Sequence, residues 1–82
     1  MPRTPRIRAK DFLKYLKNFD CSATTVSGSH HKIINNKNNK NSVLAIHSNE
    51  ILAPGLFVAI LRQLEIDKTE FINFINKWQS YD

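Results

Sequence analysis

Two histidines and a lysine follow one another between residues 28 and 34, which read Gly-Ser-His-His-Lys-Ile-Ile. Side chains of an extended strand alternate between its faces, so His30 and Lys32 share one face while His31 shares the other with Ile33. An imidazole titrates near neutral pH, and a lysine can stabilise charge that develops on a phosphate. A base that removes the proton of an RNA 2′-hydroxyl allows that oxygen to attack the adjacent phosphate. The segment therefore suits acid–base chemistry at an RNA phosphodiester, although an ordinary surface role for His30 is the alternative.

Metal binding and nucleophilic catalysis have less support. Neighbouring strand histidines point to opposite faces and cannot easily share one ion, and the sequence has no CxxC or HExxH spacing. We therefore expect neither a metal site nor a cofactor. The single cysteine, Cys21, is expected as a small buried residue. Ser29 beside His30 is not a catalytic triad, because sequence neighbours rarely have the required geometry.

The charge is concentrated in the first half of the 82 residues. Residues 1–40 contain nine Lys and Arg against two Asp, whereas residues 41–82 contain three against five Asp and Glu. A basic half indicates a side that binds a polyanion, although many small proteins are simply basic. A lone cysteine fits a reducing compartment, and no apolar run is long enough to span a bilayer, so a cytoplasmic protein without a membrane partner is expected.

Hydrophobic spacing predicts a single domain over residues 9–79, preceded by a flexible basic arm at residues 1–8. A helix is expected over 9–19, with Lys14 and Lys17 on its polar side. Strands are expected over 21–27, 29–34 and 42–47, and an asparagine-rich loop at 35–41 would display Lys37 and Lys40. Helices should follow over 56–64, beginning near Pro54, and from an Asp67 cap to about residue 79. The apolar residues that they should bury are Phe57, Ile60, Leu61 and Leu64 in the first and Phe71, Ile72, Ile75 and Trp78 in the second. The predicted class is α+β: a helix, a three-stranded antiparallel sheet, a helix and a short extra C-terminal helix.

A hairpin symmetric about the asparagine loop would pair His31 with Ile46 and Ile33 with Leu44 on a core face. The other face would pair Lys32 with Ala45 and His30 with His47. In that register His47 could act as the acid that complements His30. A slip of one residue would remove this arrangement, because every side chain would change face.

Two motifs in this order resemble the HicA toxin family. The first is Gly28-Ser29-His30-His31 followed by a strand. The second is a strand ending in His47 and then Pro54-Gly55 and Ile60-Leu61-Arg62-Gln63. The resemblance covers roughly residues 7–74. It implies a fold similar to double-stranded-RNA-binding domains, and the activity of a toxin that cleaves mRNA without the ribosome. It also implies neutralisation by a HicB-like antitoxin that covers the active surface.

The family's essential histidine corresponds to His30, and in some members to the next position, His31. His30 is the first choice, because His31 is expected to be buried on the core face and unable to reach a phosphate. RNA contacts are expected from Lys32 and, more widely, from Ser29, Lys37, Lys40, Lys14 and Lys17. The sequence departs from the family by reading Leu44-Ala45-Ile46 where a Val-Pro pair is common. A non-catalytic RNA-binding module, or a degenerate toxin acting mainly through partner binding, is the alternative.

Overall fold

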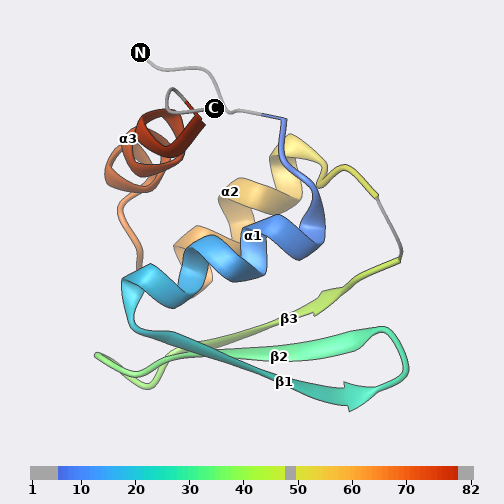
Figure 1. The fold of residues 1–82 in the computed structure, drawn as a ribbon. Helices are drawn as coiled ribbons and strands as arrows, with labels where there is room; N and C mark the ends of the chain where they lie inside the picture. Colours follow the sequence, from blue (N-terminus) through green and yellow to red (C-terminus); the bar gives the residue numbers. More distant parts are fainter. Residues whose placement is uncertain (1–5, 48–49, 80–82) are drawn as a thin grey trace.

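A computed structural model describes residues 6–47 and 50–79, with the side chains of 78 and 79 excluded. Helix α1 (Ala9–Leu16) continues as a 3₁₀ turn, η1 (Lys17–Phe19). Strands β1 (Cys21–Ser27), β2 (His30–Asn35) and β3 (Asn41–Ala45) form the sheet, and helices α2 (Pro54–Gln63) and α3 (Lys68–Gln79) follow. All three helices lie on one side of the sheet, and its other face is left open (Figure 1). The predicted α+β class and order of elements are confirmed.

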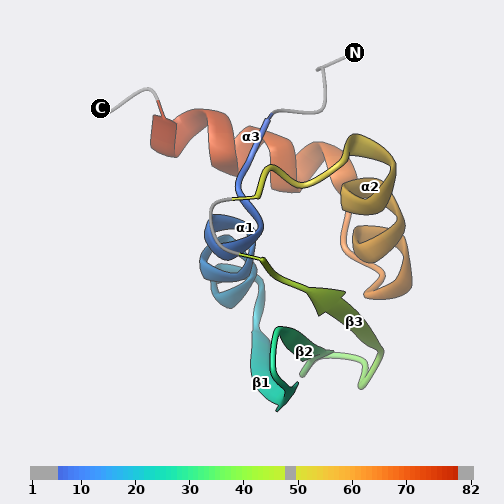
Figure 2. The ribbon, with the colours of Figure 1, turned by 90° about the vertical axis from the view of Figure 1, so that its right-hand side faces the viewer.

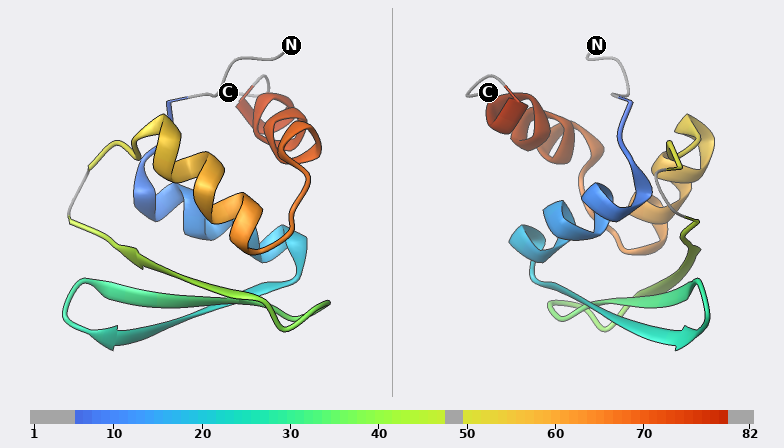
Figure 3. Two further views of the ribbon diagram at one scale, coloured as in Figure 1. Left: turned by 180° about the vertical axis from the view of Figure 1, so that it is seen from behind. Right: turned by 45° about the vertical axis from the view of Figure 1, so that its right-hand side comes forward.

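The sheet is antiparallel in the order β1-β2-β3. Ile33 and Leu44 are almost fully buried beneath the helices, and the residues next to them in sequence, Lys32 and Val43, are exposed. This alternation is the burial pattern of a sheet that has one covered and one solvent-facing side. In β1 only Cys21 is buried, and the end of the β1–β2 hairpin projects beyond the helices (Figure 3).

The β2–β3 pairing differs by two residues from the predicted register. His30 lies opposite Ala45 rather than His47, and Lys32 lies opposite Val43 rather than Ala45. A shift of two residues keeps each side chain on its predicted face, so the assignment of His30 and Lys32 to one face is correct while their partners were wrong. The turn is tighter than expected, because the Asn35 amide N–H donates to the Lys40 carbonyl at 2.8 Å.

The asparagine-rich loop is fastened to the end of α2. The side-chain amides of Asn35 and Asn38 both donate to the Leu64 carbonyl, at 2.8 and 3.1 Å. Helix ends leave carbonyls without intrahelical partners, so these two amides cap α2 from another part of the chain. Asn39 has a left-handed backbone (φ 62°), which asparagine tolerates better than most residues. The loop thus has a structural role that its composition alone did not reveal.

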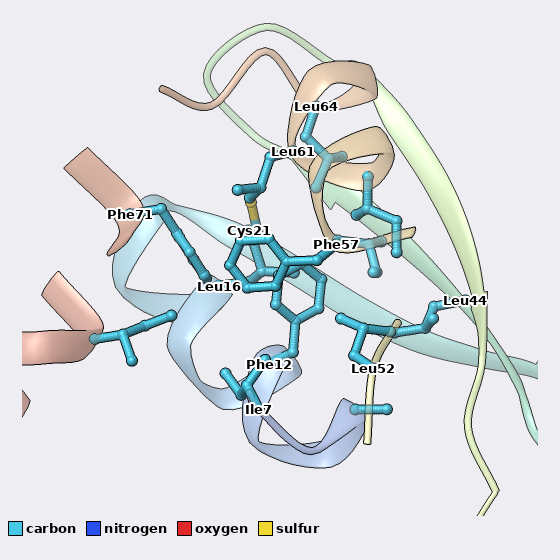
Figure 4. Packing of buried hydrophobic residues seen from close by; sticks show 14 of the residues in the cluster. Ile7, Phe12, Leu16, Cys21, Leu44, Leu52, Phe57, Leu61, Leu64 and Phe71 are labelled. Carbon is cyan, nitrogen blue, oxygen red and sulfur yellow. The ribbon is translucent and has the colours of Figure 1, made fainter. Parts of the chain in front are cut away.

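Three phenylalanine rings form the centre of the core, with Phe12 from α1, Phe57 from α2 and Phe71 from α3 (Figure 4). Their ring centroids are 5.2–5.7 Å apart, within the range of favourable aromatic contacts. The predicted apolar stripe of α2 is confirmed, and its other members are also buried: Ile60, Leu61 and Leu64. Pro54 occupies the start of this helix, as expected.

Helix α3 begins at the predicted cap, where an Asp67 carboxylate oxygen accepts the Glu70 amide N–H at 2.9 Å. It packs Phe71, Ile72 and Ile75 fully into the core. With 12 residues it is longer than α1 and α2, so the expected extra helix is present but is not short. The predicted burial of Trp78 lies outside the described side chains.

The last residues of the predicted N-terminal arm belong to the domain. Ile7 is buried, and its carbonyl accepts the Leu52 amide N–H at 2.8 Å. The Ala9 amide N–H donates in turn to the Glu50 carbonyl at 3.0 Å. The apolar side chain of Ile7 therefore extends the ordered domain into the stretch expected to be flexible, and residues 1–5 lie outside the described part.

Two glycines should respond oppositely to substitution by alanine. Gly28 has φ +52°, a conformation that costs an L-residue about 1–2 kcal/mol, so Gly28→Ala should destabilise the fold by about that amount. Gly55 lies in the first turn of α2, and a Cβ added there meets no atom within 4 Å. Gly55→Ala should therefore stabilise the fold by about 0.5–1 kcal/mol. Urea unfolding of both variants measures the difference, and equal shifts of the same sign would contradict it.

Candidate nucleic-acid interface

The open face of the sheet places His30 and Lys32 side by side along β2. Both side chains are exposed, and two residues separate their positions by about 7 Å along a strand. Thr24 of β1 and Val43 of β3 lie opposite Lys32, and Val43 is 56% exposed. An imidazole and a cation thus share a face of the sheet that no described helix covers (Figure 2).

Backbone irregularities surround His30. The tight turn at residues 28 and 29 precedes it, and β1 contains a bulge between Thr25 and Ser27, so that Ser27 lies opposite His30. Ser29 is half-buried, and its carbonyl accepts the Ile46 amide N–H at 2.8 Å. These contacts fix the backbone where the chain enters β2 at His30. The bulge locally bends β1, the strand that pairs with β2 here.

His31 lies on the helix-covered face, as predicted, but it is half-buried rather than buried. Its ring Nδ1 is 3.4 Å from the hydroxyl of Thr25, its cross-strand neighbour, in an exposed contact. The strand end carrying it projects past the helices, which explains the incomplete burial. Burial alone therefore does not remove His31 from consideration, and the choice of His30 depends on its shared face with Lys32.

His47 is exposed and lies two residues beyond Ala45, the partner of His30. The predicted direct pairing of His30 with His47 is wrong, because β3 is displaced by two residues relative to that register. A residue two positions past a direct partner is a diagonal neighbour, about 7–8 Å away in a regular sheet. The Glu50 amide N–H donates to the His47 carbonyl at 3.2 Å.

The other predicted RNA-binding lysines are not gathered around His30. Lys37 and Lys40 follow the opposite end of β2, which is about 17 Å from His30 along the strand. Lys40 lies 3.6 Å from the Glu65 carboxylate, and Lys37 lines a hollow together with Glu65, Asp67 and Glu70. Lys14 and Lys17 are exposed, but they belong to the helical side of the sheet. Lys32 is the one cation among these predicted lysines that shares the face of His30.

A family model described as the HicA toxin of bacterial toxin–antitoxin systems matches residues 9–66. The match covers most of the chain, including the entire sheet and the turn before His30. The chain belongs to the HicA toxin family. It is therefore the toxin component of a toxin–antitoxin module, and an antitoxin partner is implied. No individual curated protein matches the chain.

Helix α3 lies beyond the segment that matches the HicA family, although its side chains complete the core. The described residues of this HicA-family toxin include no helix long and apolar enough to cross a membrane. They also include no group of three or more His, Cys, Asp or Glu that could hold a metal ion. The candidate site consists of His30, Lys32 and the strand residues opposite them.

Sequence reasoning missed two residues beside the candidate site and one at the far end of β2. Thr25 contacts His31, Val43 faces Lys32, and Asn35 fixes the end of β2 against α2. Asn35 could have been identified from the sequence, because it lies on the same strand face as His31 and Ile33. A polar side chain on that covered face needs hydrogen-bond partners in the interior. The other two depend on strand register and had no separate signal.

Cys21 is a buried free cysteine at the start of β1. Burial raises the pKa of its thiol, the nearby Asp20 carboxylate raises it further, and Lys37 opposes both effects. The folded protein therefore keeps this proton to a higher pH than the unfolded chain. The stabilisation is complete below the unfolded thiol's pKa, about 8.5, and is lost as the pH rises through the folded value.

Two measurements test the state of Cys21. Native protein at pH 8 should react with iodoacetamide more slowly than protein in urea, because only the thiolate is nucleophilic. Unfolding free energy should also fall less steeply above about pH 8.5 in Cys21→Ala than in the unchanged chain. Equal alkylation rates in the native and denatured states would contradict the predicted protection.

Proposed function

We propose that this toxin is a ribosome-independent endoribonuclease that cleaves mRNA by histidine acid–base catalysis in the cytoplasm. The observation that carries the proposal is the exposure of His30 and Lys32 on the same uncovered face of the sheet. Membership of a toxin family supports a toxic enzymatic activity. His30 and Lys32 would supply the base and the cation that phosphodiester cleavage needs. A HicB-like antitoxin would neutralise the toxin by covering this face.

In the proposed reaction His30 removes the proton of a 2′-hydroxyl, and that oxygen attacks the adjacent phosphorus. The bond from phosphorus to the 5′-oxygen then breaks, and the leaving oxygen takes a proton. Lys32 offsets the negative charge that develops on the phosphate oxygens. His47, diagonal to His30 in the register, is the candidate donor of the second proton, and His31 is the second candidate for the base. The products are a 2′,3′-cyclic phosphate and a 5′-hydroxyl.

The products distinguish this reaction from other routes. Purified toxin incubated with a structured mRNA in EDTA should yield ends with 2′,3′-cyclic phosphate. Fragments with 3′-hydroxyl and 5′-phosphate ends would contradict the proposed attack by the 2′-oxygen. If the RNA is bound with a steep salt dependence but never cut, the chain is instead a non-catalytic RNA-binding module. Negligible RNA affinity would favour a degenerate toxin that acts through its protein partner.

Lys32 and Lys37 form a matched pair of tests, because both are exposed lysines of the same hairpin. Lys32→Ala should lower the cleavage rate by about 100-fold, since it removes the cation on the face of His30. Lys37→Ala should change the rate less than about threefold, because this lysine lies at the far end of the strand. Single-turnover cleavage at constant ionic strength measures both. Comparable losses in the two variants would indicate general electrostatic attraction instead of a local role.

A further inference from the structure

The outer edge of β1 is a second surface that the proposed function leaves unused. In the described chain β1 has β2 as its one strand neighbour, so its other side borders solvent. Six of its seven residues are exposed, and Val26 is 63% exposed. Edge strands usually carry charges or proline that discourage pairing, but this strand reads Cys-Ser-Ala-Thr-Thr-Val-Ser and contains neither.

The hydrogen-bond pattern shows which backbone groups of β1 face outward. The Asp20 carbonyl accepts the Asn36 amide N–H at 2.9 Å, which marks the first hydrogen-bonded pair of this ladder. Bonded and non-bonded pairs alternate along antiparallel strands, so Ser22 and Thr24 bond to β2. Cys21, Ala23 and Thr25 therefore direct their N–H and C=O groups away from the sheet. This spacing matches the backbone of one additional strand.

A row of exposed lysines lies on the helical segment that leads into β1. Lys10, Lys14 and Lys17 are exposed at helical spacing along α1 and η1. Tyr15, on another side of α1, contacts Phe74 of α3, so the row occupies the flank remote from α3. Figure 2 shows α3 above α1 and β1 below it, so α1 lies between α3 and the first strand of the sheet.

We infer that the outer edge of β1 binds an extended, acidic segment of a partner protein as an additional strand, with the lysine row contacting its acidic side chains. A peptide strand satisfies both the outward N–H and the outward C=O groups. RNA suits the edge less well, because outward carbonyls repel phosphates. A second copy is also disfavoured, since pairing two chains of net charge +5 would bring two lysine rows together.

A blocked seven-residue peptide that alternates glutamate with valine or threonine provides the probe. Added to the full chain at low salt, it should bind and slow hydrogen exchange of the Ala23 and Thr25 amides by tenfold or more, an effect followed by NMR. The same peptide with alternate amides N-methylated cannot form the ladder and should not bind. The version with lysine in place of glutamate should bind at least about fivefold more weakly.

Substitutions test the two components separately. Ala23→Pro removes an outward N–H, which proline tolerates on an edge strand, and should weaken peptide binding about tenfold. It should leave RNA cleavage unchanged. Lys14→Glu together with Lys17→Glu should weaken binding about fivefold, whereas Lys68→Glu, an exposed position on α3, should have little effect.

Several results would overturn the inference. The inference fails if the N-methylated peptide binds as tightly as the unmodified one, or if Ala23→Pro binds the peptide as tightly as the unchanged chain. It also fails if the peptide slows hydrogen exchange on the His30 face and not in β1, or if the chain self-associates through β1. An RNA oligonucleotide that displaces the peptide and protects Ala23 would assign the edge to nucleic acid. The N-methylated peptide uses the unchanged chain, so it decides the question even if Ala23→Pro fails to fold. If the unchanged chain binds the peptide but does not cleave RNA, the proposed function is refuted and the proposed interface stands.

Discussion

His30→Ala is expected to abolish RNA cleavage while leaving the fold intact. The side chain is exposed on the open face and makes no described contact with the core, so its removal should change stability by less than about 0.5 kcal/mol. Loss of the general base should lower the single-turnover rate by about 10²–10⁴-fold. Cleavage of a labelled mRNA in EDTA measures the rate, and a thermal melt measures the fold.

His31→Ala is the matched control, because it removes the neighbouring imidazole from the opposite face. It should lose the contact with Thr25 and the packing of a half-buried ring, at a cost of about 1 kcal/mol. It should still cleave RNA within about tenfold of the unchanged chain. If His31→Ala folds but is inactive while His30→Ala still cleaves RNA, the proposed ribonuclease activity stands. The catalytic histidine would then be His31, on the opposite face of β2.

The elements of this fold could be predicted from local patterns, whereas the strand pairing could not. Residue spacing identified β1 with its observed bounds and the cap at Asp67, because both depend on neighbouring residues. The β2–β3 register depends instead on Asn35, whose amide reaches Leu64 across 29 positions in sequence. A symmetric hairpin takes no account of that contact, so it misplaced His47 by two residues. The faces survived because side-chain alternation has a period of two.

The candidate site was predictable to the same extent. Alternation along β2 was enough to place His30 with Lys32, since both belong to one strand. Other lysines were assigned to RNA binding by charge alone, and charge along the sequence does not show which of them lie near His30 in the fold. Lys37 and Lys40 lie at the far end of β2 from His30. The half-burial of His31 could not be predicted from the sequence either, because it depends on how far the hairpin extends past α1 (Figure 3).

The largest stability effect is expected from Phe71, although α3 lies outside the HicA-matched segment. Phe71 is fully buried, with ring centroids 5.4 Å from Phe12, 5.0 Å from Phe19 and 5.7 Å from Phe57. Phe71→Ala should cost about 3–5 kcal/mol, because it leaves a cavity where these rings converge. That loss corresponds to a fall in Tm of about 15–30 °C for a domain of this size.

Controls on the same helix separate ring packing from helix propensity. Asn73→Ala changes an exposed position and should shift Tm by only a few degrees. Phe74→Ala should cost less than Phe71→Ala, because Phe74 is half-buried. A chain ending at Asp67 should fail to fold, since it would expose apolar surface of Phe12, Phe19 and Phe57 to water. A cooperative melt of that truncated chain near the Tm of the full protein would show instead that the HicA-matched segment is stable alone. The aromatic contacts of α3 would then be secondary to the packing of α1 and α2 on the sheet.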